Sequence, residues 1–312
     1  MYVSSLSAYT NITDKPYSSG EELQKPTPLF YHVTGEDGQE MWLFGTIHVG
    51  DERTANLPSE IRTAFDASDA FALELDADAF ADQMDDDPEF AEQVLSAYIY
   101  TDGTTTKDHI SDTQLYEDAE KMLKASGQFS STALLMKANM WATSIDNFVM
   151  QQGYEFCSEY GIETILEHWA EESDKELIEV ESAYDQIVML TDFSDELQEQ
   201  LLAESVYVDF AESNADLREL FELWCSGDEA ALIEYLKPDT SELTAEELEL
   251  YNEYVNALET VRNAKMHDVA VDYLESGDVI FYAVGLAHLI SEDGLVNTLR
   301  DSGYTVELVT YN

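Results

Sequence analysis

Two histidines in this chain each follow a glycine by three positions at the end of an apolar stretch. The first copy is Gly45-Thr-Ile-His48 and the second is Gly285-Leu-Ala-His288. The apolar runs before them predict buried β-strands, and open α/β sheets gather ligand-binding and catalytic groups at the carboxyl ends of their strands. Random placement of 14 Gly and 6 His in 312 residues gives roughly 0.3 such spacings. We interpret the two histidines as one paired site, although turn glycines followed by hydrogen-bonded core histidines would give the same pattern.

Two glutamates and one arginine lie where they could join these histidines. Glu74 interrupts an apolar run, and burying a carboxylate is costly unless a cation or a hydrogen-bond donor compensates it. A solvent-facing position on an edge strand is the alternative for Glu74. Glu181 falls at the expected carboxyl end of another short strand. Of five arginines, only Arg262 lies in a helical pattern that leads directly into the strand before His288.

A mixed set of imidazoles and carboxylates indicates a particular chemistry. Such ligands suit Mn, Fe, Co or Zn better than Mg or Ca, and water bound to such a metal is a nucleophile near neutral pH. Arg262 could hold a substrate carboxylate or offset the charge of a developing oxyanion. The sequence has no Gly-x-Ser-x-Gly, His-Glu-x-x-His, phosphate-loop or Gly-x-Gly-x-x-Gly motif. The residues therefore favour metal-dependent hydrolysis over the other catalytic classes considered.

Two further acidic groups are better explained as solvated helix surface. The Asp85-Asp-Asp-Pro segment lacks the alternating ligands of a calcium loop and predicts a cap at a helix start. His168 with Glu171 or Glu172 has metal-like helical spacing, but such pairs arise easily among 66 acidic residues.

The elements that must position the site alternate between strands and helices. Strands are expected at 29–34 and 40–48, which form a hairpin, and at 70–76, 176–182, 279–284 and 304–309. A continuous apolar helix is expected over 131–160, and a capping box at Thr244 predicts the start of another long helix. We predict an α/β fold in which a mixed sheet has flanking helices and a large helical insertion. Residues 1–27 are expected to be a polar tail or linker, and 28–312 one domain with helical sections at about 80–170 and 184–275.

The excess of acidic over basic residues argues against some classes of binding partner. With 14 basic and 66 acidic residues, the formal net charge is −52, which argues against nucleic-acid and polybasic membrane roles. The acidity is explained more simply by solubility in high salt or outside the cell than by dedicated cation binding. No apolar run of 18 residues is present, so no integral membrane segment is expected. The two cysteines, Cys157 and Cys225, define no disulfide framework, and whether they pair is left open.

Several segments resemble, in the same order, those of the TraB/GumN family, which includes the Tiki metalloproteases and bacterial pheromone-shutdown proteins. The resemblance covers about Phe30 to Val309. It rests on Leu43-Phe-Gly-Thr-Ile-His-Val-Gly50, Leu73-Glu-Leu-Asp76, Glu181 with Gln186, Arg262-Asn263 with Met266, Val284-Gly-Leu-Ala-His-Leu289, Asp293-Gly294 and Gly303-Tyr304.

The resemblance implies a fold similar to the erythromycin-esterase and ChaN group, and metal-dependent cleavage of peptides. It implies that His48, His288 and Glu74 bind the metal, which would be Mn, Co, Fe or Zn. Glu74, Glu181 and Arg262 would be catalytic, and Arg262 and Asn263 would bind substrate. The chain departs from the family pattern at Ile178-Glu-Val-Glu181-Ser, where Gly-Leu-Glu-Thr is usual, and at Ile290-Ser291, where a glycine is usual.

Two expectations remain open beside this one. The same cleft could sequester a peptide or small ligand without turnover, as the pheromone-shutdown relatives suggest. An extracytoplasmic or cell-surface location is expected, with a leader absent from this sequence, and the cytoplasm of a halophile is the alternative.

Overall fold

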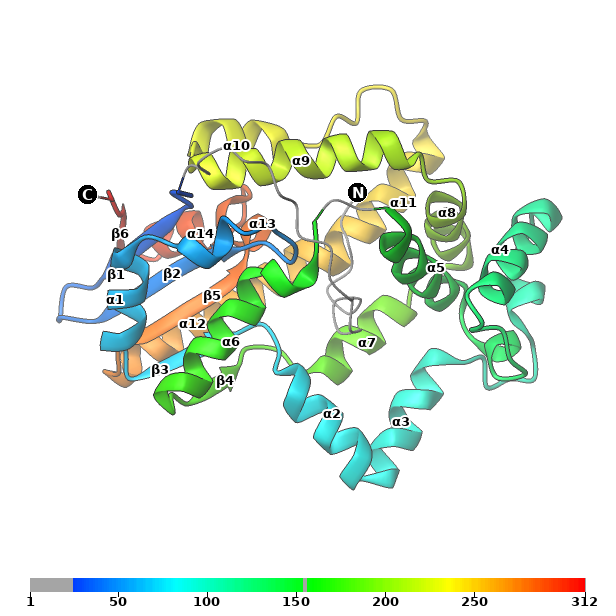
Figure 1. The fold of residues 1–312 in the computed structure, drawn as a ribbon, viewed down its shortest axis with the longest axis horizontal. Coiled ribbons are helices and arrows are strands. Elements are labelled where there is room, and N and C mark those ends of the chain that lie inside the picture. Colours follow the sequence, from blue (N-terminus) through cyan, green and yellow to red (C-terminus); the bar gives the residue numbers. More distant parts are fainter. Residues whose placement is uncertain (1–24, 154–155, 312) are drawn as a thin grey trace.

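The structure, a computed structural model, describes residues 25–153 and 156–311 (Figure 1). The predicted tail falls mostly on residues 1–24, outside the described residues. Within the described residues, six strands form one sheet in the order β4-β3-β5-β2-β1-β6. These strands are β1 (Phe30–Thr34), β2 (Glu40–Thr46), β3 (Ala70–Leu73), β4 (Leu177–Glu179), β5 (Ile280–Gly285) and β6 (Thr305–Leu308).

The sheet is mixed, and its parallel strands carry the candidate site residues. Strands β4, β3, β5 and β2 run parallel to one another, whereas β1 is antiparallel to both β2 and β6. The predicted hairpin of the first two strands is therefore confirmed. Because the four parallel strands share a direction, their carboxyl ends lie along one edge of the sheet.

Helices make up most of the remaining chain. The longer ones are α1 (Ser59–Ala67), α2 (Ala77–Asp86), α3 (Pro88–Tyr98), α4 (Thr113–Ala125), α5 (Ala138–Gly153), α6 (Ile162–Ser173), α7 (Ala183–Thr191), α8 (Asp195–Val206), α9 (Phe210–Ser226), α10 (Glu229–Leu236), α11 (Ala245–Val255), α12 (Val261–Ser276), α13 (Leu286–Ile290) and α14 (Leu295–Asp301). Short 3-10 turns lie at Thr54–Asn56, Thr106–His109, Ala133–Leu135 and Ser158–Tyr160, and a π-helical turn at Asn256–Thr260 joins α11 to α12. None of the described helices is long and apolar enough to cross a bilayer.

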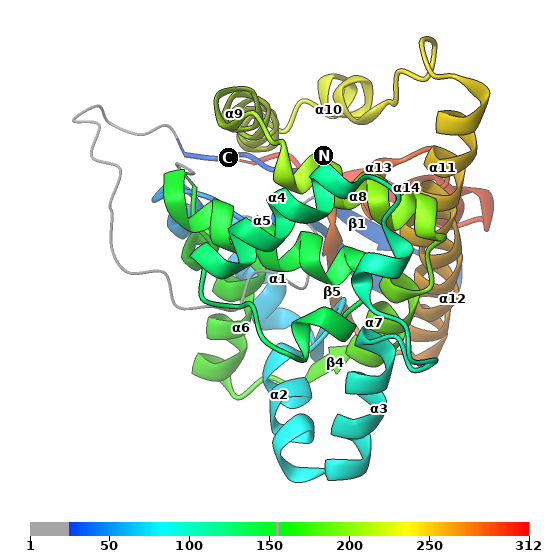
Figure 2. The same ribbon diagram turned by 90° about the vertical axis from the view of Figure 1, so that its right-hand side faces the viewer.

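Helices cover both faces of the sheet, with α1 and α6 on one side and α12 and α14 on the other (Figures 1 and 2). Successive residues of β5 show why, because side chains alternate between the faces of a strand. The ring of Phe281 packs against Phe65 of α1 at a centroid distance of 5.3 Å. The next residue, Tyr282, donates a hydrogen bond from its hydroxyl to the Met266 carbonyl of α12. The predicted mixed α/β fold is confirmed.

The helical insertion lies beyond the carboxyl ends of the parallel strands, since β3 leads into α2 and β4 leads into α7 (Figure 1). It has its own core, centred on Trp141 and Ile145 of α5 and Leu202 of α8. The continuous helix expected over 131–160 is wrong, because α5 begins only at Ala138. Before α5, Met136 forms an isolated antiparallel β-bridge with Ile99.

Candidate active site at the carboxyl ends of the parallel strands

Each of the four parallel strands places one of the predicted side chains just beyond its carboxyl end. Thr46 of β2 and Gly285 of β5 are paired in register, so His48 and His288 leave neighbouring strands at nearly the same level. On the other side of β5, Glu74 follows β3, and its carbonyl accepts a hydrogen bond from the backbone N–H of Glu181 at 2.8 Å. The sheet order therefore arranges the four groups as Glu181, Glu74, His288 and His48 along one edge.

Arg262 connects three of these four groups. Its Nη2 lies 2.7 Å from Oε2 of Glu74, and its Nε donates to Oε2 of Glu181 at 2.8 Å. Its Nη1 lies 2.9 Å from Nε2 of His288. Because guanidinium groups only donate, Nε2 of this imidazole must be the acceptor. The prediction from sequence that a buried Glu74 needs a cation or a hydrogen-bond donor as its partner is confirmed.

The arginine enters the site from a helix with an irregular start. The π-helical turn Asn256–Thr260 immediately precedes α12, and Nη1 of Arg262 also donates to the Leu258 carbonyl at 3.4 Å. Single π-helical turns are frequent at functional sites because they change the direction in which nearby side chains point. Arg262 is only 8% exposed, so its charge is available almost entirely to the groups around it.

The glycines of the two motifs allow close approaches that a side chain would disturb. The N–H of Gly285 donates to Oε1 of Glu74, and a Cβ at this glycine would lie 3.1 Å from the same oxygen. A Cβ at Gly45 would lie 3.0 Å from Leu289 and 3.1 Å from Leu286, which are residues of α13. The first motif therefore packs directly against the helix that carries His288.

Burial and neighbouring charge set the ionisation of Glu74. Burial alone would raise its pKa, but the Arg262 guanidinium, the two histidines and the Gly285 N–H outweigh that effect and hold the pKa at about 2. Glu74 is thus a carboxylate at neutral pH, already hydrogen-bonded on both oxygens.

His288 is held through both ring nitrogens. Its Nδ1 lies 2.7 Å from Oδ1 of Asn263, whose amide nitrogen donates to Ser291 and to Asp293. This orientation of the amide makes its oxygen the acceptor, so the histidine carries its proton on Nδ1. Burial lowers the pKa of His288, and Arg262 lowers it further against the attraction of Glu74, which leaves it at about 4. His288 is therefore a neutral imidazole whose Nε2 lone pair faces the guanidinium.

His48 has a different partner and the opposite ionisation. Its Nδ1 lies 2.9 Å from Oε1 of Glu163, in the first turn of α6. Burial opposes protonation of the ring, but the Glu163 carboxylate outweighs burial and raises the pKa of His48 to about 9. Glu163 was not identified from sequence. Its helix reads as an ordinary acidic helix, and only the packing of α6 against the loop after β2 brings it to the histidine.

The donor types at this edge fit a transition metal, but their present hydrogen bonds use the same atoms. In metal sites, a histidine commonly donates its other ring N–H to a carboxylate or carbonyl. His288 has such a hydrogen bond to Asn263, whereas His48 forms an ion pair with Oε1 of Glu163, which has no hydrogen-bond partner among the described residues. Arg262 occupies Oε2 of Glu74 and Nε2 of His288. Within residues 25–153 and 156–311, no three His, Cys, Asp or Glu side chains form a group that could hold a metal as it stands. Coordination by Glu74 and His288 therefore requires the guanidinium to move.

The two acidic groups that the sequence analysis interpreted as solvated helix surface lie away from this site. His168 is 66% exposed and forms ion pairs with Glu171 and Glu172 of its own helix, at 3.9 and 3.4 Å. Asp87 accepts from the backbone N–H groups of Glu89 and Phe90, which is the predicted cap at the start of α3.

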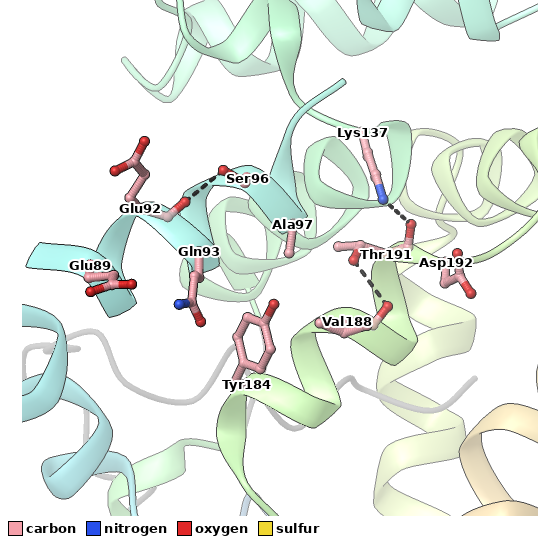
Figure 3. Close-up of a pocket in the computed structure, with 10 residues that line it drawn as sticks. All are labelled: Glu89, Glu92, Gln93, Ser96, Ala97, Lys137, Tyr184, Val188, Thr191 and Asp192. Atoms are coloured by element: carbon pink, nitrogen blue, oxygen red, sulfur yellow. Dashed lines mark hydrogen bonds between the residues drawn. The ribbon is translucent and has the colours of Figure 1, made fainter. Parts of the chain in front are cut away.

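A separate pocket of about 570 Å³ lies between α3 and α7 (Figure 3). Tyr184 and Val188 of α7 face Gln93 and Ala97 of α3 across it (Figure 3). Another residue of α7, Gln186, instead donates to Oε2 of Glu181 at 3.2 Å. Helix α7 therefore contributes both to this pocket and to the carboxylate network at the strand ends.

Comparison with known proteins gives one match. The model of the TraB/PrgY/gumN family matches residues 29–308, a span that begins just before β1 and ends with β6. No curated protein and no solved structure matches the chain, so the expected likeness to the erythromycin-esterase and ChaN fold stays a prediction.

Proposed function

The chain belongs to the TraB/PrgY/gumN family, and from this premise we propose that it is a metal-dependent hydrolase that acts on peptides. The observation that carries the proposal is the shared setting of the two motif histidines. Each has Nδ1 against an acceptor, Glu163 for His48 and Asn263 for His288. In histidines that bind metals, an acceptor at Nδ1 commonly accompanies coordination through Nε2.

His48, His288 and Glu74 are the proposed metal ligands, and Mn, Co, Fe or Zn is the metal class that suits them. When bound, such a metal polarises a substrate carbonyl and activates water for hydrolysis. Binding requires Nη1 of Arg262 to leave Nε2 of His288, while its Nε contact with Glu181 can remain.

The chain's own groups have distinct proposed roles. Glu181 is buried and lies 2.7 Å from Nη2 of Arg262, and we propose that it or Glu74 serves as the general base. Arg262, once released from His288, is placed to orient a substrate carboxylate or to offset charge on an oxyanion. Asn263 was expected to bind substrate, but it is 1% exposed and its amide is fully engaged by His288, Ser291 and Asp293. We therefore assign it the task of orienting His288.

Metal analysis after loading tests this function. The wild-type protein should retain about one equivalent of transition metal after gel filtration, and His48→Ala and His288→Ala should lose it. A peptide library incubated with the loaded protein should yield cleavage products by mass spectrometry that a chelator abolishes. A wild-type protein that retains no Mn, Co, Fe or Zn would refute the proposal.

A second candidate is a non-catalytic protein that sequesters a peptide or small ligand at the same edge. It is favoured by the network around Arg262, in which Glu74, Glu181 and His288 are all contacted by one guanidinium. Under this alternative, peptide affinity should persist in chelator and no products should form. Metal-dependent cleavage would exclude it.

The net charge of −52 supports an extracytoplasmic or cell-surface setting, with the cytoplasm of a halophile as the alternative. It also argues against nucleic acid as a partner.

A further inference from the structure

We infer that the pocket between α3 and α7 binds a short peptide with free ends, whose terminal carboxylate lies at Lys137 and whose terminal amine lies at Glu89 and Glu92 (Figure 3). The inference rests on the proposed function for the class of ligand, a peptide, but not for the metal. The pocket can therefore be tested in protein that holds no metal.

Lys137 is a half-buried cation without a carboxylate beside it. Four other lysines form ion pairs with carboxylates: Lys121, Lys124, Lys237 and Lys265. Within residues 25–153 and 156–311, Lys137 has no carboxylate at ion-pair distance, and its Nζ donates to the Thr191 carbonyl at 2.6 Å. Burial lowers the pKa of Lys137, and Asp192 offsets burial only in part. An ammonium group has three N–H donors, so a carboxylate in the pocket could accept from Nζ and supply the missing counter-charge.

The middle of the pocket offers apolar contact from both helices. The Tyr184 ring packs against Phe90 of α3 at a centroid distance of 5.9 Å, which fixes the ring. Val188 is 38% exposed and lies one turn further along α7, with Ala97 across from it (Figure 3). Residues four apart share a helix face, so Tyr184 and Val188 form one surface. Apolar walls with a few polar groups are typical of ligand pockets.

The opposite end of the pocket carries carboxylates. Glu89 and Glu92 are exposed residues three positions apart on α3. They lie on the far side of Tyr184 from Lys137 (Figure 3). The lining therefore has a lysine at one end, two glutamates at the other and an aromatic ring between them.

This distribution of charge favours a zwitterion over a simple ion. A ligand that carried only a carboxylate would be repelled by the field of a chain with a net charge of −52. A ligand that carried only an amine would leave Lys137 without a counter-charge. A free peptide carries both charges at neutral pH, because its α-amine has a pKa of about 7.7–8.0 and its α-carboxyl one of about 3.3–3.7. Its side chains can contact the apolar middle of the pocket.

Helix α7 joins the pocket to the strand-end site. Gln186 lies between Tyr184 and Val188 in sequence, but it is buried and donates to Oε2 of Glu181 at 3.2 Å. One face of α7 therefore lines the pocket while another holds a proposed catalytic carboxylate. This arrangement places the pocket next to the strand ends, where we propose that peptides are cut.

Peptide binding in the presence of a chelator tests the inference. The probes are three tetrapeptide libraries with Ala, Leu, Val or Phe at each position: one with free ends, one amidated at the carboxyl end and one acetylated at the amino end. Affinity selection with mass spectrometry finds the binders, and calorimetry measures the strongest. Amidation should weaken binding to wild type about 10-fold or more, because it removes a charge-assisted hydrogen bond. Acetylation should weaken it less, because Glu89 and Glu92 are exposed.

Three variants locate the binding. Lys137→Met should bind the free peptide about 10-fold more weakly than wild type, and amidation should cost nothing further in this variant. Val188→Trp should exclude all three libraries, because it fills the pocket from a partly exposed position. Lys121→Met is the matched control: it removes a lysine that is 68% exposed on α4, and it should bind peptides as wild type does.

Equal wild-type affinity for free and amidated peptides, or no binding by any library, would overturn the inference. So would an effect of amidation that persists in Lys137→Met. Should that variant not fold, Val188→Trp decides: unchanged affinity would overturn the inference, and loss of binding together with the wild-type effect of amidation would support it.

Failure of this inference can be distinguished from failure of the proposed function. Cleavage by metal-loaded protein that shows no binding at the pocket would overturn the inference alone. Binding at the pocket by protein that retains no metal would refute the proposed function alone.

Discussion

Arg262 and Glu74 lie 188 positions apart in sequence, yet Nη2 of the arginine lies 2.7 Å from Oε2 of the glutamate inside the protein. The side chains are 9% and 10% exposed. The same guanidinium also contacts Glu181 and His288, so one cation from α12 joins the ends of β3, β4 and β5. The site is therefore a network of buried charged and polar groups, in which each carboxylate depends on Arg262 for its compensating charge.

Replacing Arg262 with Met should destabilise the fold, because it leaves two buried carboxylates without a cation. We expect a loss of about 3–5 kcal/mol at pH 7, measured by urea unfolding. The loss should shrink in acid, where the carboxylates can take up protons. Arg62→Met is the control: Arg62 is 35% exposed and pairs with Asp66 and Glu172, so its loss should cost about 1 kcal/mol or less. Equal effects of the two substitutions would contradict this account.

Gly45→Ala should be destabilising through overpacking. The new methyl group would lie 3.0 and 3.1 Å from the side chains of Leu289 and Leu286, and extra volume in a packed core typically costs about 1–3 kcal/mol. Thermal and urea unfolding would measure the loss. Shortening the neighbour in Leu289→Val should reduce it, and a penalty that is the same in both backgrounds would show that the contact is not its cause.

The buried carboxyl group of Asp146 should make the protein less stable as the pH rises from about 4 to about 6. Burial raises the pKa of this carboxyl from 3.8 to about 6, although the neighbouring Ser205 hydroxyl lowers the pKa and partly offsets burial. Between these two values the folded state binds more protons than the unfolded state, so stability decreases from about pH 4 to pH 6. Asp146→Asn should remove this slope and gain up to about 3 kcal/mol at pH 7, because each pKa unit corresponds to about 1.4 kcal/mol.

Asp86→Asn is the matched control for that substitution, since it makes the same change in net charge at an exposed position. The two variants should differ in unfolding free energy at pH 7 and converge near pH 4. Parallel pH profiles would contradict the assignment.

Metal affinity should rise with pH because His48 is protonated in the metal-free protein. Its pKa is raised to about 9 by Glu163 against the effect of burial, and a ring that is protonated on both nitrogens cannot be a ligand. Below about pH 9, binding should release one proton, and affinity should increase about tenfold per pH unit from this group alone. Calorimetry in buffers of different ionisation enthalpy counts the proton. Affinity that is flat between pH 7 and 9 would rule out His48 as a ligand.

The sequence was sufficient to predict the strands that carry the site and the residues at their ends. The Gly-x-x-His spacing, the carboxylate inside an apolar run at Glu74 and the position of Arg262 before β5 are local signals with direct physical meaning. The capping box at Thr244 was likewise confirmed as the start of α11.

Other features depend on contacts between distant segments and leave no local signal. Glu163 resembles the many other glutamates of the chain until α6 packs beside His48. The orientation of the Asn263 amide is set by its hydrogen bonds to Ser291 and Asp293, which lie in a loop distant in sequence. The break before α5 arises because Met136 pairs with Ile99, which helical periodicity cannot reveal.

The central claim is that the two motif histidines share one metal, and a crystal structure of Mn²⁺- or Co²⁺-soaked protein with anomalous scattering tests it most directly. The account predicts one anomalous peak, about 2 Å from Nε2 of both His48 and His288, with Nη1 of Arg262 displaced from His288. A map with no peak between these rings, and with Arg262 still hydrogen-bonded to His288, would contradict it.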